Sequence, residues 1–104
     1  MDFLVCKKAC SGTRQIPQED ILLTDIKDMT KAISMARFIA SESRRGLMVA
    51  LFTQDAKPVC GWKVMRKGQL KDMEKDVIKD NFYNVIPADI ILAKREEVML
   101  TTQR

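Results

Sequence analysis

Histidine is absent from this chain of 104 residues, and its absence excludes several enzyme classes. Without an imidazole, the chain cannot form a Ser-His-Asp triad, a Cys-His catalytic pair or a zinc site with histidine ligands. Glycine and proline are also scarce, with four and three residues, whereas 46% of the residues are apolar. That composition excludes a collagen-like chain, a flexible linker and a disordered chain. The length is usual for one domain, so we expect residues 1–104 to form a single domain.

Cysteine is almost as rare, with only Cys6, Cys10 and Cys60. A small secreted domain held by disulfides carries an even set of four or more cysteines. Residues four apart on a strand lie about 13 Å from each other, too far for a disulfide between Cys6 and Cys10. A structural zinc site needs four ligands, which three scattered cysteines do not supply. We therefore expect free thiols, no bound metal and no cofactor.

Long apolar runs are missing as well. The longest uninterrupted run is Leu47–Phe52, whereas a membrane-spanning helix needs about 20 apolar residues. Near the start of the chain, Lys7 and Lys8 follow a short apolar stretch, the reverse of the order in a secretory signal. The sequence therefore predicts a cytoplasmic protein that makes no contact with a membrane.

Positive charge is concentrated in one segment. The formal net charge is +4, and the stretch 57–71 has five basic residues and no acidic one. Together with Trp62, these side chains are the candidate binding residues, because an aromatic ring among cations can stack on a base while the cations hold phosphates. The alternative is a buried Trp62 on one side of a strand, with Lys63 on the solvated opposite side. The candidates are Lys57, Trp62, Lys63, Arg66, Lys67 and Lys71.

Hydrophobic spacing and turn residues predict the secondary structure. Apolar residues at steps of three and four predict a helix over about 25–45, with Thr24 as its N-cap and Gly46 as its left-handed C-terminal cap. A second helix is predicted over about 70–83. The predicted strands cover about 2–8, 47–52, 59–67 and 89–93, and the tail at 98–101 is compatible with one more edge strand.

These elements predict an α/β (α+β) fold. We expect a single-layer mixed sheet of four or five strands with two helices, in the order β-α-β-β-α-β with or without a last strand.

Part of the chain resembles a known family. The stretch from Leu51 to Val64, the corner from Arg66 to Leu70 and the segment from Ala88 to Ala93 are similar to RadC-type JAB/MPN domains. In that family, the last segment leads into a His-x-His-Pro motif and a later Asp, which bind a catalytic zinc. Here Lys94-Arg95-Glu96-Glu97 follows instead, and these residues cannot replace the imidazole ligands. The resemblance therefore implies a degenerate relative that lacks the metal-binding motif and the hydrolase activity.

These observations favour a protein that binds without catalysis. We expect a binding or regulatory module on a metal-free JAB-like scaffold that acts through contact with a partner protein. By analogy with small relatives, the resemblance implies an inhibitor of a host defence or DNA-processing complex, encoded by a phage or a mobile element. The alternative is a small nucleic-acid-binding module that uses the basic segment 57–71.

Overall fold

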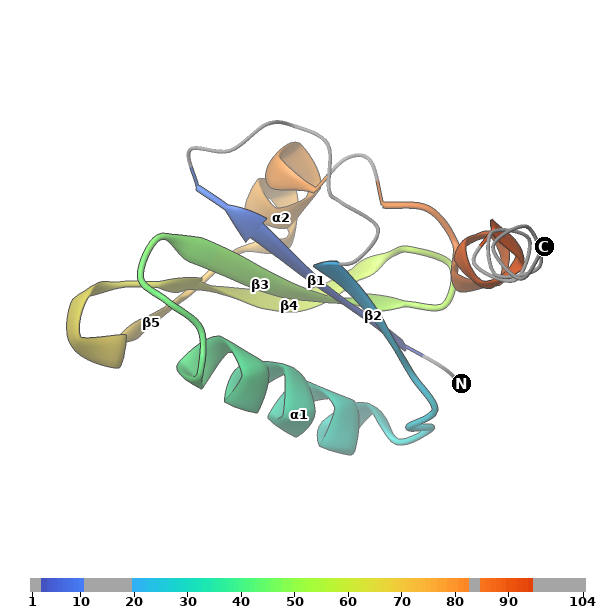
Figure 1. Cartoon of the computed structure of the whole chain (residues 1–104), viewed down its shortest axis with the longest axis horizontal. Coiled ribbons are helices and arrows are strands. Elements are labelled where there is room, and N and C mark those ends of the chain that lie inside the picture. Colours follow the sequence, from blue (N-terminus) through green and yellow to red (C-terminus); the bar gives the residue numbers. More distant parts are fainter. Residues whose placement is uncertain (1–2, 11–19, 83–84, 95–104) are drawn as a thin grey trace, which may run out of the picture.

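The computed structural model describes residues 3–10, 20–82 and 85–94, and everything below concerns these residues. Five strands form one sheet in the order β2-β1-β3-β4-β5, and every neighbouring pair is antiparallel (Figure 1). Residues 88–94 are helical. The remaining elements are β1 (Phe3–Ala9), β2 (Ile21–Thr24), α1 (Met29–Ser41), β3 (Leu47–Thr53), β4 (Pro58–Val64), the 3₁₀ turn η2 (Arg66–Gly68), β5 (Leu70–Asp72) and α2 (Lys75–Asn81).

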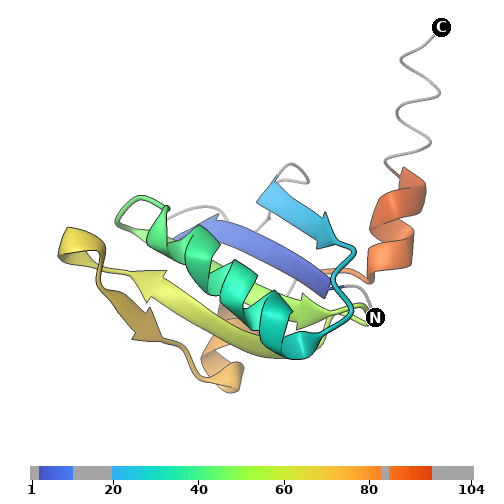
Figure 2. The same ribbon diagram turned by 90° about the horizontal axis from the view of Figure 1, so that it is seen from below.

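Helices cover the two faces of the sheet unequally. The α1 helix lies across one face, and α2 lies on the other (Figures 1 and 2). Because side chains alternate along a strand, Phe3 and Val5 pack on the α1 face, while Leu4 and Cys6 pack on the α2 face. Both faces of the central strands are therefore buried.

Small side chains let α1 approach the sheet closely. Ala32, Ala36 and Ala40 recur every four residues and are completely buried. They pack against the cluster that contains Val49, Leu51 and Trp62. The helix begins at its N-cap Asp28, whose side chain accepts a hydrogen bond from the Thr30 N–H at 2.8 Å. The predicted N-cap at Thr24 is wrong, because β2 ends at that residue.

On the other face, Gly61 lets α2 approach the sheet closely. A Cβ atom on Gly61 would lie 3.1 Å from Ile78 Cδ1, 3.1 Å from the Val49 carbonyl oxygen and 3.2 Å from Ala50 Cβ. Such distances are too short for an undisturbed side chain, so the absence of one lets Ile78 rest on the strands. Beyond Ile78, the rings of Phe52 and Phe82 meet edge to face at 5.8 Å between centroids.

The predicted fold class is confirmed, including a sheet of five strands. The predicted mixed sheet is wrong because all pairs are antiparallel, and the predicted order of elements is wrong in three places. The β2 strand lies in a stretch for which no strand was predicted, and it ends at the predicted N-cap Thr24. The β5 strand occupies the expected start of the second helix, and residues 88–94 form a helix where a strand was expected. The possible strand at 98–101 lies outside the described residues.

These differences have local physical causes. A short apolar run such as Ile90-Ile91-Leu92 fits a buried strand and a helix equally well. Pro87 precedes it, and its carbonyl accepts from the Ile91 N–H at 3.2 Å, which starts a helical turn. The first helix covers 29–41 rather than the predicted 25–45. Gly46 has the predicted left-handed conformation, with a φ of 91°, but it lies in the turn before β3 rather than at the end of the helix.

No helix within the described parts of the chain has the length and apolar character needed to span a membrane.

Candidate binding site

The structure separates the six candidate binding residues. Trp62 is only 5% exposed and packs under α1, so its ring cannot stack on a base in this structure. Lys57 is exposed in the turn that precedes β4, whereas Arg66 and Lys67 lie in η2 after that strand. The basic segment is therefore not one continuous surface.

Two of the six residues do come together. Lys63 on β4 is paired directly with Lys71 on β5. On its other side, Lys63 is paired with Met48 on β3, and Met48 is paired with Lys8 on β1. Residues opposite each other in a sheet share a face, so all four side chains lie in one row on the α2 face. The register thus forms a row of three lysines and one methionine across four strands.

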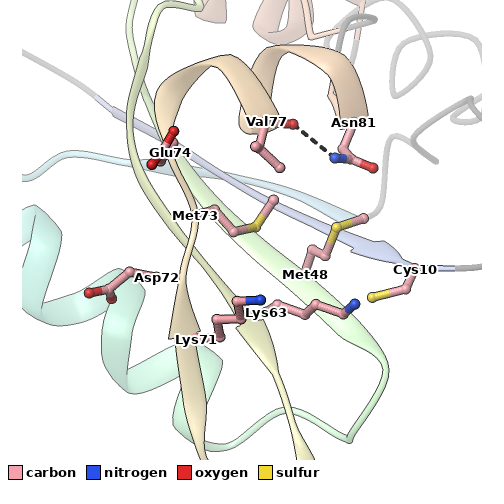
Figure 3. A pocket seen from close by; sticks show the side chains of 9 residues that line it. All are labelled: Cys10, Met48, Lys63, Lys71, Asp72, Met73, Glu74, Val77 and Asn81. Carbon is pink, nitrogen blue, oxygen red and sulfur yellow. Dashed lines mark hydrogen bonds between the residues drawn. The ribbon is translucent and has the colours of Figure 1, made fainter.

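A cavity of about 520 Å³ opens on this face, between the row and α2 (Figure 3). Its size is typical of a ligand pocket. The Met48 and Met73 side chains lie in its middle, and Val77 of α2 lies above them (Figure 3). The lining residues are Cys10, Met48, Lys63, Lys71, Asp72, Met73, Glu74, Val77 and Asn81.

Charges in the cavity are unevenly placed. The Lys63 and Lys71 side chains lie on one side, and Lys63 extends toward Cys10 (Figure 3). The Glu74 and Asp72 carboxylates point away from both lysines (Figure 3). Within residues 3–10, 20–82 and 85–94, no carboxylate forms an ion pair with either ammonium group. The cavity therefore offers two cations beside an apolar centre.

The third lysine of the row holds α2 in place. Lys8 is 9% exposed, and its Nζ donates a hydrogen bond to the Asn81 carbonyl oxygen at 2.6 Å. Asn81 in turn donates from Nδ2 to the Val77 carbonyl oxygen at 2.8 Å (Figure 3). A buried ammonium needs such a partner, because an unpaired one would carry the full cost of lost hydration. Lys8 thus fixes the last residue of α2 beside the cavity.

The three cysteines lie in different environments. Cys10 is exposed and lines the cavity. Burial raises the pKa of the Cys6 thiol to about 12. Burial also raises the pKa of the Cys60 thiol, and the nearby negative charge of Asp72 raises it further. Cys6 and Cys60 are therefore protonated and poorly nucleophilic at neutral pH. The described part of the chain contains no group of three or more Cys, Asp or Glu side chains placed to hold a metal ion.

Sequence reasoning missed most of the cavity. Lys63 and Lys71 were among the candidates, but the apolar centre and Glu74 were not. The alternation of β4 contained part of the signal, because it placed Lys63 opposite to Trp62. The contributions of Cys10 and Met48 depend on pairing between distant strands, which no local pattern reveals.

Comparison of the chain with protein-family models, curated proteins and solved structures finds no match. The assignment of the site therefore rests on its own geometry.

Proposed function

We propose that the protein is a non-catalytic binding module whose cavity receives a short acidic and apolar segment of a partner protein. The observation that carries this proposal is that Lys63 and Lys71, beside the Met48 and Met73 side chains, form no ion pair within the described part of the chain. Carboxylates of the segment are attracted to the lysines, which favours encounter and orientation. An apolar side chain of the segment then enters the centre of the cavity.

The apolar centre suits a protein ligand. Methionine side chains are flexible and polarizable, so they adapt to apolar groups of different shapes. Binding energy in protein interfaces is concentrated where an anchor side chain fills a desolvated pocket. Val77 is 43% exposed in the free protein and supplies additional apolar surface for this contact.

An inhibitor carried by a phage or a mobile element, acting on a host defence or DNA-processing complex in the cytoplasm, is one protein of this kind. The resemblance to RadC-type JAB/MPN domains stays a prediction, and the proposed binding mode does not depend on it.

Nucleic-acid binding is the second candidate. Arg66 and Lys67 in η2 favour it, because η2 joins the two strands that carry Lys63 and Lys71. Two features weigh against it: the buried ring of Trp62 leaves no stacking platform there, and the Glu74 carboxylate repels a phosphate backbone.

A displayed library of short random peptides tests the proposal. We expect selection on the wild-type protein to enrich peptides with acidic residues next to apolar ones. The double variant Lys63→Glu/Lys71→Glu should weaken their binding about tenfold or more, because it reverses both charges at the cavity. The matched control Lys31→Glu/Lys75→Glu changes the total charge equally at exposed positions that do not line the cavity.

Three results would contradict the proposal. They are a selection that enriches nothing, equal losses in the two double variants, and tighter binding of duplex DNA than of any peptide. In the last case, log K should fall against log salt with a slope of about −0.9 for each phosphate contact.

A further inference from the structure

Lys63 and Lys71 carry like charges at facing positions of neighbouring strands beside the cavity, and this arrangement is unfavourable without a ligand. Lys63 and Lys71 are direct cross-strand partners, so their Cα atoms lie about 5 Å apart. Like charges in such positions destabilise an antiparallel pair. In the described residues neither ammonium group has an acidic partner that would offset the repulsion. An anion bound between the two amines would remove it.

We propose that this anion is a phosphomonoester, carried by a serine or threonine of the partner segment. The inference rests on the proposed function and specifies its ligand. A phosphomonoester has a charge of about −1.5 to −2 at neutral pH and three strong acceptor oxygens. Each lysine ammonium has three donors and no acceptor, so one phosphate can accept from both. A carboxylate carries a single negative charge and leaves one of the two cations uncompensated.

Glu74 restricts the ligand to one compact anion. It follows Lys71 by three residues, which corresponds to at most about 10 Å along an extended chain. Glu74 also lines the cavity, at a distance from the lysines, so negative charge is favoured near the lysines and disfavoured near Glu74. A polyanion with charges along its whole length therefore fits poorly. A single phosphorylated residue with apolar neighbours fits both the charges and the side chains of Met48 and Met73.

The test uses a peptide enriched by the display selection. Its acidic position is replaced by serine, glutamate or phosphoserine, and the affinity of each version is measured by fluorescence anisotropy. We expect the phosphoserine version to bind about tenfold more tightly than the glutamate version, and the serine version to bind most weakly. At pH 5 the advantage of phosphoserine should shrink, because the phosphate loses its second charge with a pKa of about 6.

Variants locate the phosphate. Lys63→Gln and Lys71→Gln each remove one cation from an exposed position, and each should reduce the preference for phosphoserine over glutamate to about twofold or less. The control Lys75→Gln removes a cation from an exposed position of α2 outside the cavity and should leave the preference unchanged. Thermal melts of all three variants check that each remains folded.

The outcomes separate this inference from the proposed function. Equal affinity for phosphoserine and glutamate overturns the phosphate assignment and leaves the peptide-binding cavity in place. An equal effect of Lys75→Gln assigns the preference to general charge and also overturns the inference. If a single-stranded oligonucleotide binds as tightly as the phosphopeptide and displaces it, the phosphate assignment is also overturned. A library that yields no peptide overturns both proposals.

Discussion

The two faces of the sheet are covered by helices of different length and composition. The 13-residue α1 buries three alanines completely and lies flat on strands β3 and β4. The seven-residue α2 buries only Ile78, and beyond it the face remains open around Lys63 and Lys71. The long α1 helix packs its small-residue face against the strands, and cavities of about 530 and 510 Å³ border its C-terminal half. A short helix anchored at one point leaves room for a binding site.

The largest expected effect concerns that anchor. Ile78→Ala removes the one buried side chain of α2, so it should reduce the free energy of unfolding by about 2–5 kcal/mol, measured by urea denaturation. Val77→Ala, at the neighbouring 43% exposed position, should cost less than about 1 kcal/mol. Equal losses would show that α2 is not held through Ile78, and the contrast between the faces would have to be withdrawn.

Larger side chains should be tolerated differently on the two faces, with the greater loss of stability on the α1 face. Ala36→Leu inserts a branched side chain between α1 and the strands, where Ala36 is fully buried, and should cost about 1–3 kcal/mol in the same measurement. Val77→Leu enlarges a side chain that borders the cavity and should change stability by less than about 0.5 kcal/mol. A neutral Ala36→Leu would mean that the α1 face has unfilled space.

The centre of the fold could be predicted because its signal is local. The apolar run Leu47–Phe52 corresponds closely to β3 (Leu47–Thr53), the strand at the middle of the sheet. A strand buried on both faces needs no alternation, so its sequence is distinctive. The periodicity of the first helix was equally clear, and in the structure its buried stripe consists of Ala32, Ala36 and Ala40.

The edges of the sheet could not be predicted in the same way. The strands β2 and β5 have only four and three residues, too few for a periodic pattern to emerge. They form because longer neighbours offer free backbone groups, which is a tertiary cause. The same limit hid the site: the pairing of Lys63 with Lys71 requires β5, which the sequence assigned to a helix.

A pH experiment tests whether α2 and residues 88–94 exclude water from the centre of the sheet face that they cover. Cys6 lies there, and burial raises the pKa of its thiol from the ordinary value of 9.0 to about 12. Below pH 9 the thiol is protonated in both the folded and unfolded states, so its contribution to stability is fully present. Above pH 9 the unfolded state releases the proton first, and stability falls as the pH rises toward 12. At pH 10 this group should cost about 1.4 kcal/mol relative to pH 7.

The measurement is urea denaturation at pH 7 and pH 10. Cys6→Ala should lose less stability between the two pH values than the wild type, because it has no thiol to ionise. Cys10→Ala, which removes the exposed thiol, should behave as the wild type. If Cys6→Ala and the wild type lose the same stability, water reaches Cys6 and the α2 face is open beyond its cavity.

The smallest expected effect is a gain in stability at the open end of the same face. Lys71→Gln keeps most of the length of the side chain but removes the charge that faces Lys63 across β4 and β5. In the absence of a ligand, relief of this repulsion should raise the free energy of unfolding by about 0.2–1 kcal/mol at low salt. The gain should shrink as added salt screens the pair.

Lys31→Gln, an exposed position of α1, should give no comparable gain. A loss of stability in Lys71→Gln would show that the two lysines do not repel each other in the free protein. The α2 face would then contain no pair of charges that lowers the stability of the free protein and awaits an anionic ligand.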